Sequence, residues 1–192
     1  MPPKAKFTKR EIIDAALELI ETSGIETLTA RNLGEKLGSS ARPIFTTFNN
    51  MEEVISAATA YANDIYTQYV EAGLAKQIPF KGVGESYIKF AGEHPKLFQL
   101  LFMQESECVP DMKNVLQGIE TSYDKILNSI VVNYDVSYEL AKTLYLHLWI
   151  YSHGIAVLIA TKVCEFTAEQ VSQMLTDVFT SVLIRAKQGA LK

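Results

Sequence analysis

The sequence has few of the residues that build disulfide frameworks, metal sites or catalytic motifs. Its 192 residues include two cysteines, Cys108 and Cys164, which have neither the number nor the spacing of a disulfide framework or a zinc site. A reducing compartment therefore fits better than an oxidising one. No Glu stands between His147 and His153 as in zinc proteases, neither cysteine is paired with a histidine in a motif, and there is no glycine-rich phosphate loop. We predict no catalytic residue, no metal site and no cofactor, and hence no enzyme.

An uninterrupted apolar run of membrane-spanning length is also missing. The N-terminus is basic but lacks the apolar core of a signal peptide. The most apolar stretch, residues 144–160, contains His147, Ser152 and His153, which favours a buried helix over a membrane span. With 48% hydrophobic and 21% charged residues, the composition is that of a globular protein. We expect a cytoplasmic protein without a membrane segment.

No stretch shows the strict alternation and Asn-Gly turns of a β-sheet. Apolar residues recur every three or four positions instead, which is the helical period. The pattern predicts an all-α protein of about nine helices, with an N-terminal three-helix domain at residues 1–50 and a larger helical domain at 51–192. Two short helices on either side of Gly38 belong to the first domain. The other helices are predicted at residues 8–23, 51–72, 80–90, 97–102, 115–133, 137–162 and 167–187.

The net charge of −4 argues against nucleic acid, but its distribution does not. Residues 1–10 contain four basic residues and no acid, and residues 29–50 contain three basic residues against Glu35. These two stretches carry +6, so the remainder carries −10. A solvated basic arm would explain residues 1–10 alone. Together the two stretches indicate one end that faces DNA and one that avoids it.

Residues 29–51, TARNLGEKLGSSARPIFTTFNNM, have the pattern of a helix-turn-helix. Leu33 and Leu37 lie one turn apart and can share a buried face, and Gly38 can take the left-handed conformation that ends a helix. Ser39 and Ser40 can cap a second helix. Its first turn would be residues 41–43, where proline is tolerated. This second helix would use Ile44, Phe45 and Phe48 as its core face and point Arg42, Thr46 and Thr47 outward.

This stretch resembles the DNA-binding domain of the TetR family of bacterial transcriptional regulators. The matching segments are TKREIIDAALELIETSG, LTARNLGEKLG, SSARPIFTTF and NNMEEV, in that order and at family-like spacing. The resemblance covers about the first quarter of the chain by motif, and the rest by helical layout and length. It implies a helical regulator, most often a repressor. The family usually has tyrosine at Phe45 and lysine at Met51, both of which usually contact phosphate.

The helix-turn-helix assigns DNA contacts to individual residues. Arg42, Thr46 and Thr47 are candidates for reading base edges in the major groove, since Arg42 can bond two acceptors on guanine. Pro43 and Ile44 are candidates for contact with a thymine methyl, although Ile44 fits the core equally well. The candidates for phosphate contact are Thr8, Lys9, Thr29, Ser39 and Ser40.

A palindromic operator needs a two-fold protein, so we predict a homodimer on double-stranded DNA. The resemblance implies an interface made of the last two helices, which form a four-helix bundle across the dimer axis in the family. Their apolar residues offer more apolar surface than one partner helix would cover; these are Leu148, Ile155, Ile159, Val178 and Val182. The alternative is that these helices complete a monomeric core.

The middle and C-terminal helices are rich in aromatic and sulfur side chains that suit an apolar or aromatic small-molecule effector. The same stripe at helical spacing is also what a plain core would show. We do not expect His153 to contact a ligand. The candidate ligand residues are Phe98, Phe102, Met103, Tyr123, Tyr145 and Trp149.

These expectations combine into a ligand-responsive transcriptional regulator, with a ligand-binding and dimerisation domain at residues 51–192. A ligand among the middle helices would tilt the helix at 51–72 and change the spacing of the two recognition helices, which must be about 34 Å apart. The rival is a dimeric helical protein that acts through a protein partner without sequence-specific DNA binding. The departures at Phe45 and Met51 support this rival.

Overall fold

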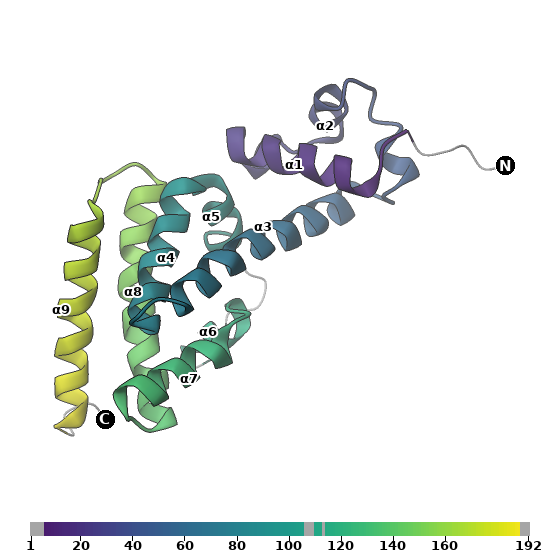
Figure 1. The fold of residues 1–192 in the computed structure, drawn as a ribbon. Helices are drawn as coiled ribbons and strands as arrows, with labels where there is room; N and C mark the ends of the chain where they lie inside the picture. The colour runs from purple at the N-terminus through teal and green to yellow at the C-terminus, as the bar shows by residue number, and fades with distance from the viewer. Residues whose placement is uncertain (1–5, 106–109, 113, 189–192) are drawn as a thin grey trace. The chain divides into compact units, whose positions relative to one another are not determined.

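The structure is a computed structural model that describes residues 6–105, 110–112 and 114–188 (Figure 1). These residues form nine α-helices and two 3₁₀ segments and no strand, so the all-α prediction is confirmed. In chain order the elements are α1 (Lys9–Ser23), η1 (Ile25–Thr27), α2 (Ala30–Lys36), η2 (Ile44–Thr46), α3 (Met51–Leu74), α4 (Pro79–Glu93), α5 (Pro95–Phe102), α6 (Val115–Ile119), α7 (Tyr123–Tyr134), α8 (Tyr138–Ala160) and α9 (Ala168–Lys187).

The chain divides into two compact units. Unit 1 consists of Met1–Ile65 and His94–Gln104, and unit 2 of Tyr66–Glu93 and Glu105–Lys192. Helix α3 contributes to both. The predicted boundary between residues 50 and 51 separates a DNA-binding domain from a ligand-binding domain. It is defined by function, and it stays a prediction.

Helix starts follow from polar residues that satisfy the first free amides. Thr8 and Thr167 form complete capping boxes with Glu11 and Gln170, and these two caps open α1 and α9. The backbone N–H of Glu53 donates to Asn50 Oδ1 over 2.8 Å at the start of α3. Local sequence therefore sets where these helices begin.

Unit 1 has an apolar core. Ile12, Ile20, Leu33, Ile44 and Phe48 are all buried between α1, α2, η2 and α3. Helix α5 packs against α1, and His94 Nδ1 lies 2.7 Å from Glu21 Oε1. Burial of these side chains holds the short elements α2 and η2 in place, because neither is long enough to be stable alone.

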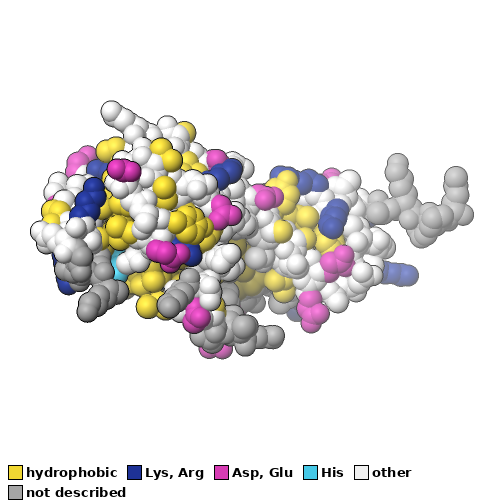
Figure 2. Space-filling model, turned by 90° about the horizontal axis from the view of Figure 1, so that it is seen from below, with side chains coloured by type: hydrophobic (Ala, Val, Ile, Leu, Met, Phe, Trp, Pro, Cys, Tyr) yellow, Lys and Arg dark blue, Asp and Glu magenta, His cyan; other side chains and the backbone are white. Residues whose placement is uncertain are grey.

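Unit 2 is built around α4 and α8, with α7 and α9 packed against them (Figure 1). Helix α8 has eight buried residues, while Ile150 and Leu158 are exposed on its other side. By length and composition α8 also satisfies the requirements of a membrane span, as core helices of many proteins do. In Figure 2, hydrophobic side chains reach the surface of unit 2 between acidic and basic ones.

The helix predicted at residues 115–133 is two helices. Glu120, between α6 and α7, has extended backbone angles and its side chain turns inward. Its carboxylate accepts hydrogen bonds from the Tyr66 hydroxyl over 2.6 Å and from the Ser122 backbone N–H over 3.0 Å. A partner 54 residues away therefore interrupts a pattern that is helical locally.

The second helix of the predicted helix-turn-helix is also shorter than expected. Its regular part is the single 3₁₀ turn η2, and neither Ser39 nor Ser40 caps it. A 3₁₀ turn is tighter than an α-helix and is used in short pieces. The prediction of a full helix from Ala41 is wrong for this reason.

Candidate nucleic-acid interface

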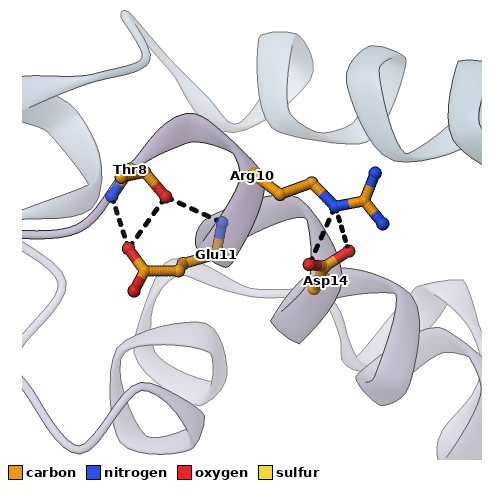
Figure 3. Close-up of polar contacts among 4 residues, drawn as sticks. All are labelled: Thr8, Arg10, Glu11 and Asp14. Atoms are coloured by element: carbon orange, nitrogen blue, oxygen red, sulfur yellow. Dashed lines mark hydrogen bonds and ion pairs between the residues drawn. The ribbon is translucent and has the colours of Figure 1, made fainter.

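The N-terminus of α1 brings the first candidate phosphate contacts to the surface. Thr8 Oγ1 donates to Glu11 Oε2 over 2.8 Å and accepts from the Glu11 backbone N–H over 3.2 Å (Figure 3). The hydrogen bonds from Thr8 lower the pKa of the Glu11 carboxyl. Lys9 is exposed beside the cap, and its Nζ lies 5.3 Å from the centroid of the Phe48 ring. The Lys9 ammonium group thus lies over the Phe48 ring of the core, at the N-terminus of α1, which is the positive end of the helix dipole.

Helix α2 positions the next candidate. Thr29 is its N-cap, and Thr29 Oγ1 accepts from the backbone N–H of Asn32 over 3.2 Å. The Asn32 side chain in turn donates to the carbonyl of Thr27 over 2.8 Å. Thr29 is exposed at the start of α2. Its backbone and hydroxyl are therefore accessible at a helix N-terminus, where anions bind favourably.

The turn after α2 depends on two glycines. Gly38 has φ +64°, the left-handed conformation expected of it. A Cβ on Gly34 would lie 2.8 Å from both the Ser40 carbonyl carbon and the Ala41 backbone nitrogen. Gly34 therefore lets α2 touch the backbone of the turn. Ser39 Oγ accepts from Lys6 Nζ over 3.0 Å, while Ser40 is exposed.

Residues 42–48 present the candidate base-reading surface. Arg42 and Thr46 are exposed, and Pro43 and Thr47 are half-buried. Thr46 Oγ1 donates to the carbonyl of Pro43 over 2.6 Å, and Thr47 Oγ1 donates to that of Phe7 over 3.4 Å. Both hydroxyl oxygens can still accept a hydrogen bond.

Three neighbouring apolar residues show how this turn is anchored. Ile44 is fully buried, which settles its orientation toward the core, and Phe48 is 1% exposed as predicted. Phe45 is 43% exposed, so its assignment to the core is wrong. In a 3₁₀ turn that buries Ile44, the adjacent residue faces away from the core. Phe45 therefore lies on the outer surface of the turn.

The basic side chains of unit 1 differ in whether they are ion-paired. Arg10 pairs with Asp14 over 2.8 Å (Figure 3), Arg31 with Glu35 over 3.0 Å and Lys36 with Glu18 over 2.6 Å. Within the residues that the structure describes, Arg42 has no ion pair. Arg42 at the exposed turn, like Lys9 at the start of α1, therefore keeps a charge without an ion pair, and both are suited to an anionic partner.

The candidate ligand residues divide between the two units. Phe98 is fully buried in unit 1, where its ring centroid lies 5.3 Å from that of Phe102, and Met103 is exposed. In unit 2, Tyr123 stacks on Tyr145 at 5.9 Å. The structure therefore joins Phe98 with Phe102, and Tyr123 with Tyr145.

Tyr145 and Trp149 also line a cavity of about 20 Å³ in unit 2, together with Tyr66, Tyr87 and Ser152. The Trp149 ring stacks on His153 at 5.1 Å, and His153 Nδ1 lies 2.8 Å from the Tyr87 hydroxyl. Burial lowers the pKa of His153, which favours the neutral ring. His153 is thus engaged beside the cavity.

Two polar groups near this cavity were missed by sequence reasoning. Ser152 is 2% exposed and its Oγ has no hydrogen-bond partner. Glu120 is 7% exposed, and burial raises the pKa of its carboxyl. The only signal for either was the departure of a polar residue from an apolar pattern. Likewise, a glycine inside a short helix, Gly34, was the available sequence signal for the close approach of α2 to the turn that follows it.

Across the described parts of the chain, no three His, Cys, Asp or Glu side chains gather in a way that could hold a metal ion. Cys164 is exposed, and Cys108 lies outside the described residues. The basic residue Lys4 lies outside them as well.

Comparisons with known proteins agree with this geometry. The sequence pattern of the family described as "Bacterial regulatory proteins, tetR family" matches residues 12–58. A comparison with curated proteins found no match.

Similar solved structures cover nearly the whole chain. A TetR-like transcriptional regulator from Rhodococcus sp. RHA1 is 15% identical, with a TM-score of 0.63 over 98% of this chain and 100% of that one. A TetR family member from Streptomyces coelicolor A3 is 15% identical, with a TM-score of 0.62 over 90% and 98%. A fatty acid degradation regulator from Bacillus halodurans is 19% identical, with a TM-score of 0.60 over 94% and 97%. At these identities the similarity shows the fold. The resemblance is therefore confirmed: residues 12–58 are a match to the TetR family of bacterial regulatory proteins, and the chain has the fold of TetR-like regulators.

Proposed function

We propose that this protein is a cytoplasmic, ligand-responsive transcriptional repressor that binds a palindromic operator as a homodimer. Residues 1–50 bind DNA, and residues 51–192 bind the ligand and form the dimer. The observation that carries the proposal is Arg42, an unpaired basic side chain on an exposed turn whose base, Ile44 and Phe48, is buried. Neither catalysis nor a cofactor is part of this function.

The roles within the DNA-binding surface follow from exposure. Arg42 and Thr46 read base edges and Thr47 supports them, because Arg42 can make two bonds to guanine. Pro43 lies beside them for apolar contact. The phosphate contacts are assigned to Thr8, Lys9, Thr29, Ser39 and Ser40, which lie at the starts of α1 and α2 and in the turn.

The dimer is assigned to α8 and α9, with a different set of residues from those expected. Leu148 and Ile155 are buried within the chain, so they cannot supply the dimer surface. Ile150 and Leu158 are exposed on α8 and eight residues apart, which places them near one face, and Ile184 is exposed on α9. Ile159, Val178 and Val182 are half-buried. An exposed apolar stripe of this kind is typical of a surface that associates.

Ligand response is assigned to α3. This helix is continuous from unit 1 into unit 2, and its residue Tyr66 both lines the unit 2 cavity and bonds Glu120. A ligand that moves Tyr66 would act on a helix shared with the DNA-binding unit. The ligand shifts the spacing of the recognition turns only by its difference in affinity for the two states.

Selection of the purified protein against random duplex DNA tests the function. We expect enrichment of an inverted repeat, with relaxed sequence preference at one base pair per half-site in Arg42→Ala and a loss of about 1–3 kcal/mol in discrimination. Arg31→Ala is the matched control, because it removes the same charge from a residue that is paired with Glu35 in the wild-type protein. No enrichment at any salt concentration would refute the proposal.

The second candidate is a dimeric regulatory protein that acts through a protein partner without sequence-specific DNA binding. The observation that favours it is the exposed apolar ring of Phe45, which stands where the family usually has tyrosine. Pull-down with wild type and Phe45→Ser distinguishes the two candidates. Retained DNA selection in Phe45→Ser supports the regulator, and loss of a protein partner with no DNA selection supports the alternative.

A further inference from the structure

Unit 2 contains a groove and a cavity that share one wall. We infer that, as the effector site of the proposed regulator, they accept a small amphiphile whose alkyl tail lies in the groove and whose hydrogen-bond-donating alcohol or amine head reaches Ser152. This inference rests on the proposed ligand response and specifies the class of ligand.

The cavity contains a polar atom that lacks a partner. Ser152 Oγ is buried without a hydrogen bond at a cavity whose other walls are mostly aromatic. A buried hydroxyl without a partner costs about 1–3 kcal/mol, which a bonded ligand recovers. Gly84, on α4, keeps the space open, because a Cβ there would lie 3.5 Å from Ser152 Oγ and 3.2 Å from Leu175 Cδ1. At about 20 Å³ the cavity has room for a water molecule or a ligand's polar head, and no more.

The groove supplies the space for the rest of a ligand. It has a volume of about 280 Å³ and is lined mainly by apolar side chains, including Ile78 just before α4 and Phe179 and Leu183 on α9, with Lys81 among them. Small-molecule sites usually have roughly 300–1,000 Å³, so the groove suits a small ligand. Its apolar lining favours an alkyl tail.

Phe80 separates the groove from the cavity. It lines both, and so does Leu148. The Phe80 ring centroid is 5.8 Å from that of Tyr145 on the cavity side and 5.6 Å from that of Phe179 on the groove side. For one ligand to occupy both spaces, the side chains that line both, Phe80 and Leu148, must give way. Phe80 is the second residue of α4 and lies two positions after the exposed Ile78.

The charge around the cavity selects the ligand's head. The Glu120 carboxylate bonds Tyr66, a cavity wall, and it raises the pKa of Tyr66, Tyr87 and Tyr145 after burial, which is the larger cause. In the described residues no ion pair joins Glu120 to a basic side chain. A carboxylate head would place a second negative charge in the same buried region, whereas an alcohol or amine would donate a hydrogen bond there.

Three probes with the same tail and different heads test the inference: octanol, octylamine and octanoate. Trp149 is the only tryptophan of the chain and lines the cavity, so its fluorescence reports on occupancy. Isothermal titration calorimetry in parallel registers binding that leaves the fluorescence unchanged. We expect octanol and octylamine to bind the free protein about tenfold or more tightly than octanoate.

Three variants locate the head. Ser152→Ala should weaken octanol binding by about fivefold to tenfold, because one hydrogen bond is lost. It should fold normally, since the hydroxyl it removes has no partner. Gly84→Ala should also weaken octanol binding, because its methyl group occupies the cavity. Lys125→Met, on α7, lines neither the groove nor the cavity, so it should leave octanol binding unchanged and serves as the control.

Two results would overturn the inference. Tightest binding of octanoate, lost in Lys81→Met, would place the head at the groove mouth. Absence of binding by all three probes in both assays would show that the groove does not take an alkyl chain. Neither result touches the DNA-selection experiment, which uses no ligand, so failure of the ligand class and failure of the regulator function are separate outcomes.

Discussion

In unit 1 the core beneath the exposed turn is apolar, whereas unit 2 encloses polar side chains among its aromatic rings. All four buried polar or charged residues among those described, Ser86, Glu120, Ser122 and Ser152, belong to unit 2. An apolar core fixes one arrangement through packing alone. A buried polar group without a partner leaves free energy that a ligand can recover. The difference fits the proposed division, in which unit 1 reads DNA rigidly and unit 2 responds to a ligand.

The largest expected effect comes from separating the two copies of the chain. The double variant Ile150→Asp with Leu158→Asp places charges on the exposed face of α8 and should convert the proposed dimer to a monomer. Loss of the second half-site contact should reduce operator affinity by about 100-fold or more. Light scattering and DNA titration measure both effects.

Val132→Asp is the control for this variant, because Val132 is 79% exposed and lies on α7, which is not one of the two proposed interface helices. If the double variant stays dimeric while folded, α8 is not in the interface.

The next largest effect is a difference in the free energy of unfolding between substitutions of Phe48 and Phe45, two phenylalanines three positions apart. Phe48→Ala should lower the free energy of unfolding by about 3–5 kcal/mol, because it leaves a cavity in the core of unit 1. Phe45→Ala should change it by less than about 0.5 kcal/mol, because Phe45 lies at the surface. Hydrogen exchange of the α1 amides measures both changes. Equal losses would contradict the 3₁₀ geometry of the turn.

Gly34→Ala tests the close approach of α2 to the turn. The added methyl group meets backbone atoms of Ser40 and Ala41 at 2.8 Å, which cannot move independently of the turn. We expect a loss of about 1–3 kcal/mol in stability and weaker operator binding. Gly118→Ala is the control, because nothing lies within 4 Å of a Cβ there. Unchanged DNA binding in Gly34→Ala would show that the turn's position does not matter.

The smallest effect is a difference in how Glu11 and Glu120 make the free energy of unfolding depend on pH. The pKa of Glu120 is raised above its ordinary value of 4.5, so between pH 4.5 and the raised pKa the folded state holds a proton that the unfolded chain has lost, and above the raised pKa the carboxylate is charged. Stability should therefore fall as pH rises from 4.5 through the raised pKa, and Glu120→Gln should remove this fall.

Glu11 has the opposite sign. Its pKa is lowered, so its contribution is present above pH 4.5 and is lost as pH falls through the lowered pKa. Glu11→Gln should remove that acid-side loss. Urea unfolding of both variants between pH 3 and 8 measures the two slopes, and slopes of the same sign would contradict the comparison.

Local sequence was enough to predict most helices, because their periods and caps are local. The left-handed Gly38 is confirmed, and the helices predicted at residues 8–23 and 167–187 begin at capping boxes formed by Thr8 and Thr167. These features depend on residues within one turn of each other. Local pattern therefore determined where α1 and α9 begin and where α2 ends.

The features that were predicted wrongly depend on partners far away in the sequence. Glu120 interrupts a helical pattern because it bonds Tyr66, and the pattern alone does not show that bond. Phe45 and Phe48 look equivalent as apolar residues, and only the tight turn over Ile44 separates them. Leu148 faces inward and Ile150 outward because of what packs on α8. DNA contacts and ligand contacts remain predictions.

The central claim is that the uncompensated charge of unit 1 binds DNA phosphates. The most direct test is operator affinity measured across a range of salt concentrations, for wild type and Lys9→Gln. We expect the logarithm of the affinity to fall linearly with the logarithm of salt concentration, with a slope of about −0.9 for each neutralised phosphate. Lys9→Gln should reduce the steepness of that slope by about one. A flat salt dependence in wild type would contradict DNA binding through this surface and favour a protein partner.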